Sequence, residues 1–189
     1  MKLILFDRCS DLCEKWQQYF KNEINVEVKQ CLFQEIKKFD CIVSPANSFG
    51  IMDGGFDEVL SNFFGTSLMS NVQSEICKSW AGEQPVGSCI IVPTGNINHP
   101  YCAHTPTMRV PKRIIGTDNI YNAMRSMLLE TQKYPIIDIV ACPGLGTCTG
   151  GVNADVAARQ MYLAYISVFY PQKVNDWKTA FHIDTIVNQ

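Results

Sequence analysis

Two segments of this chain each combine a short β-branched strand, a glycine-rich loop and the start of a helix. The first is Ser44-Pro-Ala-Asn-Ser-Phe-Gly-Ile-Met-Asp-Gly-Gly-Phe-Asp57, and the second is Cys142-Pro-Gly-Leu-Gly-Thr-Cys-Thr-Gly-Gly151. Glycine lets backbone N–H groups turn toward a ligand, and a helix N-terminus adds positive potential, so this arrangement is typical of phosphate binding. Two such loops in one chain predict a ligand with phosphate at its middle, held from two sides.

Short apolar strands alternate with amphipathic segments along most of the sequence. The expected strands are 2–6, 26–30, 41–43, 88–92, 101–105 and 136–141, and the expected helices are 11–21, 57–64, 67–81, 117–133 and one that begins near Asn153. This alternation predicts an α/β fold, a three-layer α/β/α sandwich with a mixed, largely parallel central sheet. Ligands of such sheets bind beyond the carboxyl ends of the strands, where both glycine-rich loops fall.

The length of 189 residues predicts one domain, 1–189, with a core of about 1–169. Residues 170–189 are expected to form an extra strand or a packed tail. The irregular segment 93–118, rich in Pro, Thr and Asn, is too long for a plain connection and predicts a shaped surface loop near the site.

Charge and hydropathy exclude several classes of protein. The formal net charge is −2 with no long basic run, so general nucleic-acid binding is not expected. No apolar run approaches the roughly 18 residues that a membrane span needs, and the first eight residues reach charge too early for a signal peptide. We therefore expect a cytoplasmic protein without a membrane partner.

The nine cysteines are odd in number, irregularly spaced and without a C-x-x-C pair, so reduced thiols are expected. A zinc site from Cys102, His104 and His99 lacks a second ligand cluster of recognisable spacing. We expect neither a metal nor a cofactor, and we expect the histidines to be structural or surface residues.

The first glycine-rich loop also carries reactive groups. The Asn47 amide can both donate to and accept from a sugar hydroxyl. Asp57 can accept a proton from water or from a hydroxyl, but it can equally cap the helix that begins there. Either loop alone also fits a plain strand-to-helix turn. Neither loop is a P-loop, because no Gly-Lys-Ser/Thr follows its glycines.

These motifs resemble those of the macro domain, an ADP-ribose-binding α/β/α module. Asp40-Cys-Ile-Val-Ser-Pro-Ala-Asn47 is similar to the family's strand ending in Val-Asn-Ala-Ala-Asn, and Gly54-Gly-Phe-Asp57 to its Gly-Gly-Val-Asp form. Pro143-Gly-Leu-Gly-Thr-Cys-Thr-Gly150 is similar to its second phosphate loop, and His104-Thr-Pro106 is a fainter likeness. The resemblance covers most of residues 1–169 in order and spacing.

The resemblance implies a role for each matching position. Asn47 would bind the hydroxyls of the distal ribose, and Asp57 matches the carboxylate that activates water in hydrolytic members. The remaining implied ligand contacts are Ala46, Gly54, Gly55 and Phe56 at the distal ribose and adjoining phosphate, and Gly144, Leu145, Gly146, Thr147, Cys148, Thr149 and Gly150 around the diphosphate.

Three positions depart from the family pattern. The Asp that commonly accepts from the adenine amino group is replaced by Leu32, so we expect that Asp7 substitutes for it, that Phe33 packs against the base, or that the base preference has changed. Cys148 stands where glycine is usual. Asp53 adds negative charge near a phosphate site, which makes a terminal-phosphate substrate less favourable than a ribose ester or glycoside.

Two functions of different classes follow. The first is binding of ADP-ribose with hydrolysis at its distal ribose, on an ADP-ribosylated protein, an O-acyl ester or a 1″-phosphate. The second is a non-catalytic module that binds or sequesters an ADP-ribose-like nucleotide. An unrelated nucleotide-binding sandwich is a third reading.

Overall fold

A single six-stranded sheet forms the centre of the molecule. In this computed structural model, which describes residues 1–188, the strand order is β2-β1-β6-β3-β5-β4. Only β4 runs antiparallel to its neighbour, so the sheet is mixed and largely parallel, as expected. The strands are β1 (Lys2–Asp7), β2 (Val26–Gln30), β3 (Cys41–Ser44), β4 (Ile90–Pro93), β5 (Tyr101–His104) and β6 (Ile139–Pro143).

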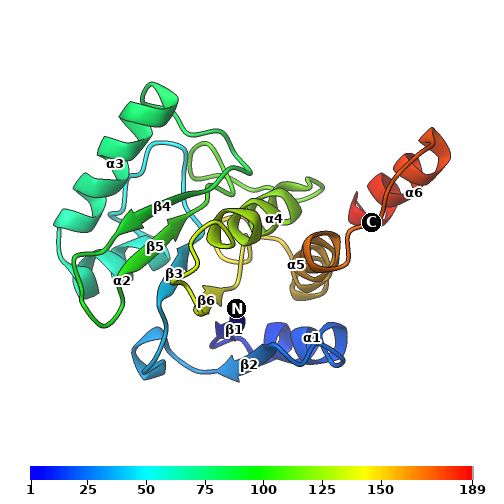
Figure 1. Cartoon of the computed structure of the whole chain (residues 1–189), viewed down its shortest axis with the longest axis horizontal. Coiled ribbons are helices and arrows are strands. Elements are labelled where there is room, and N and C mark those ends of the chain that lie inside the picture. Colours follow the sequence, from blue (N-terminus) through cyan, green and yellow to red (C-terminus); the bar gives the residue numbers. More distant parts are fainter. Residues whose placement is uncertain (189) are drawn as a thin grey trace.

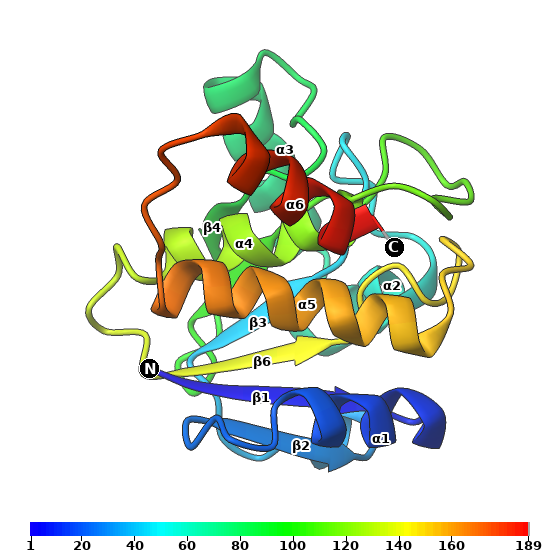
Figure 2. The ribbon, with the colours of Figure 1, turned by 90° about the vertical axis from the view of Figure 1, so that its right-hand side faces the viewer.

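Helices cover both faces of this sheet, which confirms the three-layer sandwich (Figure 1). One face carries α1 (Ser10–Tyr19), α4 (Asn119–Thr131) and α5 (Ala154–Phe169), and the other carries α2 (Gly55–Phe64) and α3 (Ser67–Trp80). A short 3-10 turn, η1 (Phe33–Glu35), follows β2. Figure 2 shows α5 with its axis running roughly along β1 and β6 on its face of the sheet.

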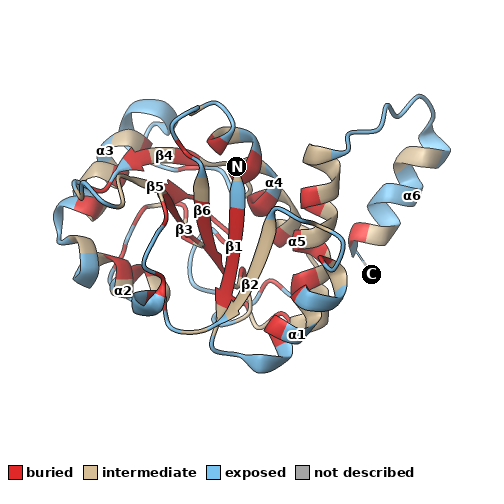
Figure 3. Ribbon diagram, turned by 60° about the horizontal axis from the view of Figure 1, so that its bottom comes forward, coloured by how far each residue is buried: buried red, intermediate tan, exposed pale blue. Residues whose placement is uncertain are grey.

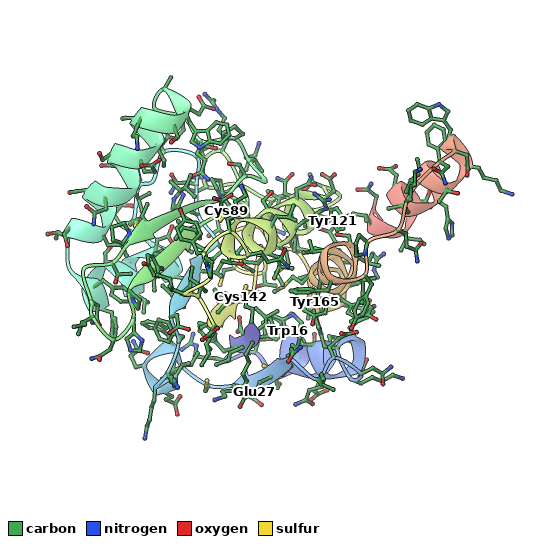
Figure 4. The ribbon with its side chains drawn as sticks, in the orientation of Figure 1. Trp16, Glu27, Cys89, Tyr121, Cys142 and Tyr165 are labelled. Atoms are coloured by element: carbon green, nitrogen blue, oxygen red, sulfur yellow. The ribbon has the colours of Figure 1, made fainter. Side chains whose placement is uncertain are left out.

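The central strands are buried on both sides, as expected of parallel strands between two helical layers. Leu3 and Leu5 of β1 face one hydrophobic cluster, whereas Ile4 and Phe6 face the other. The inner strands are accordingly buried in Figure 3, whereas the helices alternate between buried and exposed faces. Trp16 of α1, labelled in Figure 4, belongs to the first cluster and is fully buried.

The C-terminal segment, expected to be an extra strand or a packed tail, contains a helix, so the strand alternative is wrong. α6 (Trp177–Asn188) lies beside α5 on the side away from the sheet (Figure 1). Val187 is its one buried residue, while Trp177 and Phe181 are 79% and 66% exposed. The segment does not extend the sheet, whose edge strands are β2 and β4.

Smaller differences concern where elements begin and end. β6 starts at Ile139 rather than Ile136, and the N–H groups of Asp138 and Ile139 donate to Asp40 Oδ2 at 2.9 and 2.7 Å. β4 likewise starts at Ile90, two residues later than expected. Among residues 1–188, no helix combines the length and the apolar character needed to cross a membrane.

Candidate functional site

A cleft of about 650 Å³ runs along the carboxyl ends of the parallel strands. The strand order places the end of β2 at one extremity, β1 and β6 in the middle, and β3 and β5 at the other. The expected site residues that line it are Asp7, Leu32, Phe33, Ala46, Asn47, Gly54, Gly55, Phe56, Asp57, Gly144, Gly146, Thr147, Cys148, Thr149 and Gly150. Both glycine-rich loops therefore face one cavity.

The loop after β6 presents backbone donors to the middle of this cleft. In the part of the chain that the structure describes, the N–H groups of residues 145–149 donate to no other protein group, although Gly146 O accepts from Val152 N at 3.1 Å. Successive unpaired N–H groups form an anion-binding concavity. This loop can therefore hold phosphate oxygens through backbone dipoles.

Close packing explains why this loop is rich in glycine. A Cβ on Gly150 would lie 2.4 Å from the Gly146 carbonyl oxygen, and one on Gly144 would lie 2.6 Å from Asp7 Oδ2. Among the residues of this loop that the family resemblance implies as ligand contacts, Leu145 is the exception, because its side chain is fully buried in the core. Leu145 does not line the cleft, whereas Cys148 is exposed and does line it.

Asp57 lies in the first turn of α2, and its carboxylate turns toward the end of β3. Its Oδ1 accepts a hydrogen bond of 2.6 Å from Ser44 Oγ, and both residues are buried. Burial raises the pKa of Asp57 from 3.8 to about 6, against the opposing effect of the Ser44 hydrogen bond. Gly54 is the N-cap of α2, so Asp57 does not serve as the cap.

Asn47 lines the cleft, but its amide is occupied by its own loop. Its Oδ1 accepts from Phe49 N at 3.0 Å and from Ile51 N at 3.3 Å, and its Nδ2 donates to Ile51 O at 2.7 Å. An Asn side chain that bonds backbone two to four residues ahead stabilises a turn. Asn47 therefore shapes the first loop, and its Oδ1 is oriented by two donors.

Gly54, Gly55 and Phe56 form the rim between this loop and α2. Gly55 has a φ of +60°, the left-handed region that favours glycine. The Phe56 ring packs against those of Phe6 and Phe33 at 5.8 and 5.7 Å between centroids. The rim is thus anchored to the aromatic cluster below it.

The end of the cleft at β1 and β2 holds the three residues expected near a base. Leu32 is 46% exposed, and its N–H donates to Glu35 Oε2 at 2.7 Å. Phe33 is 4% exposed and belongs to the aromatic cluster, so its ring is mainly a core group. Asp7 Oδ1 accepts from Cys9 N at 2.9 Å, which leaves Oδ2 beside Gly144.

Sequence reasoning missed several lining residues, among them Arg8, Thr107 and Met108. The irregular segment 93–118 does supply part of the wall. It arrives there because Asn47 and Met108 form an isolated parallel bridge that prolongs the pairing of β3 with β5. Thr107 is 1% exposed, and its Oγ1 has no hydrogen-bond partner within residues 1–188. No sequence motif predicts the pairing of Asn47 with Met108.

The residues considered for a zinc site have other partners. Burial lowers the pKa of His104 to about 3, and its Nδ1 lies 2.7 Å from Gln84 Oε1. His99 stacks on Phe39 with ring centroids 3.9 Å apart. Across the 188 described residues, no three His, Cys, Asp or Glu side chains gather as metal ligands would.

The macro domain family model matches residues 43–161, and this chain therefore belongs to the macro domain family. The match includes both glycine-rich loops and begins after β1 and β2. An uncharacterized protein of Aquifex aeolicus is 35% identical over 122 residues, which are 65% of this chain and 70% of that protein. One of Aeropyrum pernix is 30% identical over 125 residues, 66% of this chain and 62% of that protein.

Solved macrodomains share the fold at lower identity. The macrodomain of Mycobacterium tuberculosis DarG has a TM-score of 0.58 at 20% identity, covering 69% of this chain and 84% of its own. A macrodomain of Oceanobacillus iheyensis with ADP has a TM-score of 0.61 at 20% identity, covering 81% and 84%. A variant of that macrodomain has been solved with ADPR, at a TM-score of 0.59, 19% identity and coverage of 81% and 86%.

Proposed function

We propose that this protein binds ADP-ribose and hydrolyses a bond at its distal ribose, with ADP-ribosylated protein as the partner class. The observation that carries the proposal is a buried carboxylate, that of Asp57, at one end of a cleft whose middle presents unpaired N–H groups. A general base is most effective when its pKa lies near the working pH. With a pKa of about 6, Asp57 is mostly ionised near pH 7 and remains basic enough to take a proton from water.

The role of each group in the reaction follows from its position in the cleft. The N–H groups of residues 145–149 hold the diphosphate, and the Asn47 side chain orients the distal ribose beside Asp57. Asp57 accepts a proton from water as the water oxygen bonds to C1″ of the distal ribose and the bond from C1″ to the substituent breaks. The substituent leaves with a proton returned from the Asp57 carboxyl group. For an O-acyl ester, the same water attacks the acyl carbonyl carbon, and the ribose oxygen leaves with that proton.

The first experiment measures release of ADP-ribose from an ADP-ribosylated protein by the wild type, Asp57→Asn and Asn47→Ala. We expect Asp57→Asn to lower the rate at least 100-fold, since general-base catalysis contributes about 10²–10⁴. A binding assay with ADP-ribose on the same variants separates lost chemistry from lost affinity. Undiminished turnover in both variants would remove these two residues from the mechanism.

One observation favours the second function, a non-catalytic ADP-ribose-binding module. Asn47 Oδ1 already accepts from the N–H groups of Phe49 and Ile51, and Nδ2 donates one of its two N–H groups to Ile51 O, so the side chain is held by its own loop and has a single N–H to offer a ribose. Calorimetric binding of ADP-ribose by the wild type, without turnover of any ADP-ribosyl ester, would support this function over hydrolysis.

A further inference from the structure

The cleft is electrically asymmetric along its length. Its end at β3 and α2 is lined by the carboxylates of Asp53 and Asp57, whereas its end at β1 is lined by Asp7 together with Arg8. Among residues 1–188, Arg8 is the only Lys or Arg side chain that lines the cleft. Arg8 follows β1, on the other side of the β6 loop from Asp53 and Asp57. The end at which the proposed hydrolysis occurs is therefore negative.

Nearby basic residues do not cancel this charge. Arg109 binds the Glu83 carboxylate through two nitrogens and lies over the Phe49 ring, 5.5 Å from its centroid. Arg113 lies beside Gly151, at the far end of the β6 loop, and does not line the cleft. Lys112 is exposed and likewise outside the lining residues.

The N-terminus of α2 does not supply a counter-charge either. A helix N-terminus attracts anions through its dipole. In α2 that dipole already faces three carboxylates, because Asp53 precedes the Gly54 cap and Asp57 and Glu58 occupy the first turn. A phosphate placed there would be repelled by these carboxylates, of which Asp57 is buried and weakly screened, while Asp53 and Glu58 are exposed to solvent.

We propose that Asp53 is a specificity-determining residue that makes the distal-ribose end select neutral or cationic substituents and reject a phosphomonoester. The substrate class is then ADP-ribose linked through its distal ribose to an acyl group or a protein side chain, rather than ADP-ribose 1″-phosphate. This inference rests on the proposed function, because it takes Asp57 as the reacting end. The diphosphate itself is bound by the N–H groups of residues 145–149 in the loop after β6.

The test compares the affinities of two ligands that differ by one phosphate. Calorimetry at low ionic strength measures dissociation constants of ADP-ribose and ADP-ribose 1″-phosphate with the wild type, Asp53→Asn and the control Asp138→Asn. Asp138 is exposed at the opposite, amino-terminal edge of the sheet. We expect the wild type and the control to bind the phosphorylated ligand at least about tenfold more weakly, and Asp53→Asn to reduce that ratio to about threefold or less.

Initial rates provide a second arm, with an O-acyl-ADP-ribose ester and ADP-ribose 1″-phosphate as substrates. Turnover of the ester with at least about tenfold slower release of phosphate agrees with the inference. Equal or tighter binding of the phosphorylated ligand by the wild type, or equal turnover of both substrates, overturns it. A wild type that binds neither ligand instead refutes the proposed function, so the two failures are distinguishable.

Discussion

Ser44 Oγ lies 2.6 Å from Asp57 Oδ1, and this is the single hydrogen bond that the buried carboxylate receives from residues 1–188. Ser44 ends β3, and Asp57, thirteen residues later, lies in the first turn of α2. The bond fixes one carboxylate oxygen, so the other is left for the cleft. It also lowers the pKa of Asp57, which burial alone would raise further.

Ser44→Ala is therefore expected to raise the pKa of Asp57 above about 6. A hydrogen bond to a charged group contributes about 1.5 kcal/mol, so hydrolysis at pH 6 should fall roughly tenfold with less loss at pH 8. Carboxyl NMR titration of Asp57 measures the pKa directly, independent of activity. Ser44→Thr keeps the hydroxyl and should stay near the wild-type value; an unchanged Asp57 pKa in Ser44→Ala would contradict this assignment.

The raised pKa of Asp57 also makes the free energy of unfolding depend on pH. Between its unfolded value of 3.8 and its folded value of about 6, the folded state binds more protons than the unfolded state. The contribution of Asp57 to the free energy of unfolding therefore falls as the pH rises from 3.8 to about 6, by about 3 kcal/mol in total. Asp57→Asn removes the titration, so we expect it to be more stable than the wild type at pH 8 by up to that amount.

Urea denaturation at pH 8 and near pH 4 measures this difference, which should shrink toward zero at the lower pH. Asp53→Asn is a suitable comparison, because Asp53 is exposed. A constant stability difference between Asp57→Asn and the wild type across this range would show that Asp57 titrates alike in both states.

Gly150→Ala should damage the β6 loop, because its Cβ would meet the backbone oxygen of Gly146 at 2.4 Å. Relieving such a contact costs about 1–3 kcal/mol, and the displaced loop should bind ADP-ribose at least tenfold more weakly by calorimetry. For the free energy of unfolding, Gly54→Ala is the matched control, since no protein atom lies within 4 Å of its Cβ position. Its ADP-ribose affinity is not a control, because Gly54 lines the cleft. Equal losses of stability in both variants would show that crowding is not the cause.

The sequence predicted the parts of the site that local patterns encode. Both glycine-rich loops, the strands before them and the parallel sheet follow from residues close together in the chain, and so does the position of Asp57 at a helix start. The partner of Asp57 was not predicted, because it depends on how α2 packs against β3. Thr107 was missed for the same reason, since the Asn47–Met108 bridge joins distant segments.

The C-terminal helix should contribute little to the binding of ligand. It contacts the body through Val187 and through bonds that Arg159 and Gln160 donate to its last turn. Removal of residues 171–189 exposes the surface under Val187, so we expect a loss of no more than about 2 kcal/mol in the free energy of unfolding. ADP-ribose affinity should be unchanged, and a chain that fails to fold would show that 1–169 is not the core of the domain.

Thr105 and Thr107 form a natural pair for testing whether an unpaired hydroxyl is kept for ligand or solvent. Both are buried, but Thr105 Oγ1 donates to Ser88 O at 2.8 Å and to Ala123 O at 3.1 Å, whereas Thr107 Oγ1 has no partner in the described chain. Leaving a buried hydroxyl unpaired costs about 1–3 kcal/mol, while a satisfied one stabilises by about 1 kcal/mol. Thr107→Val should therefore raise the Tm of the ligand-free protein, and Thr105→Val should lower it. Loss of stability in Thr107→Val would mean that an ordered water satisfies the hydroxyl in solution.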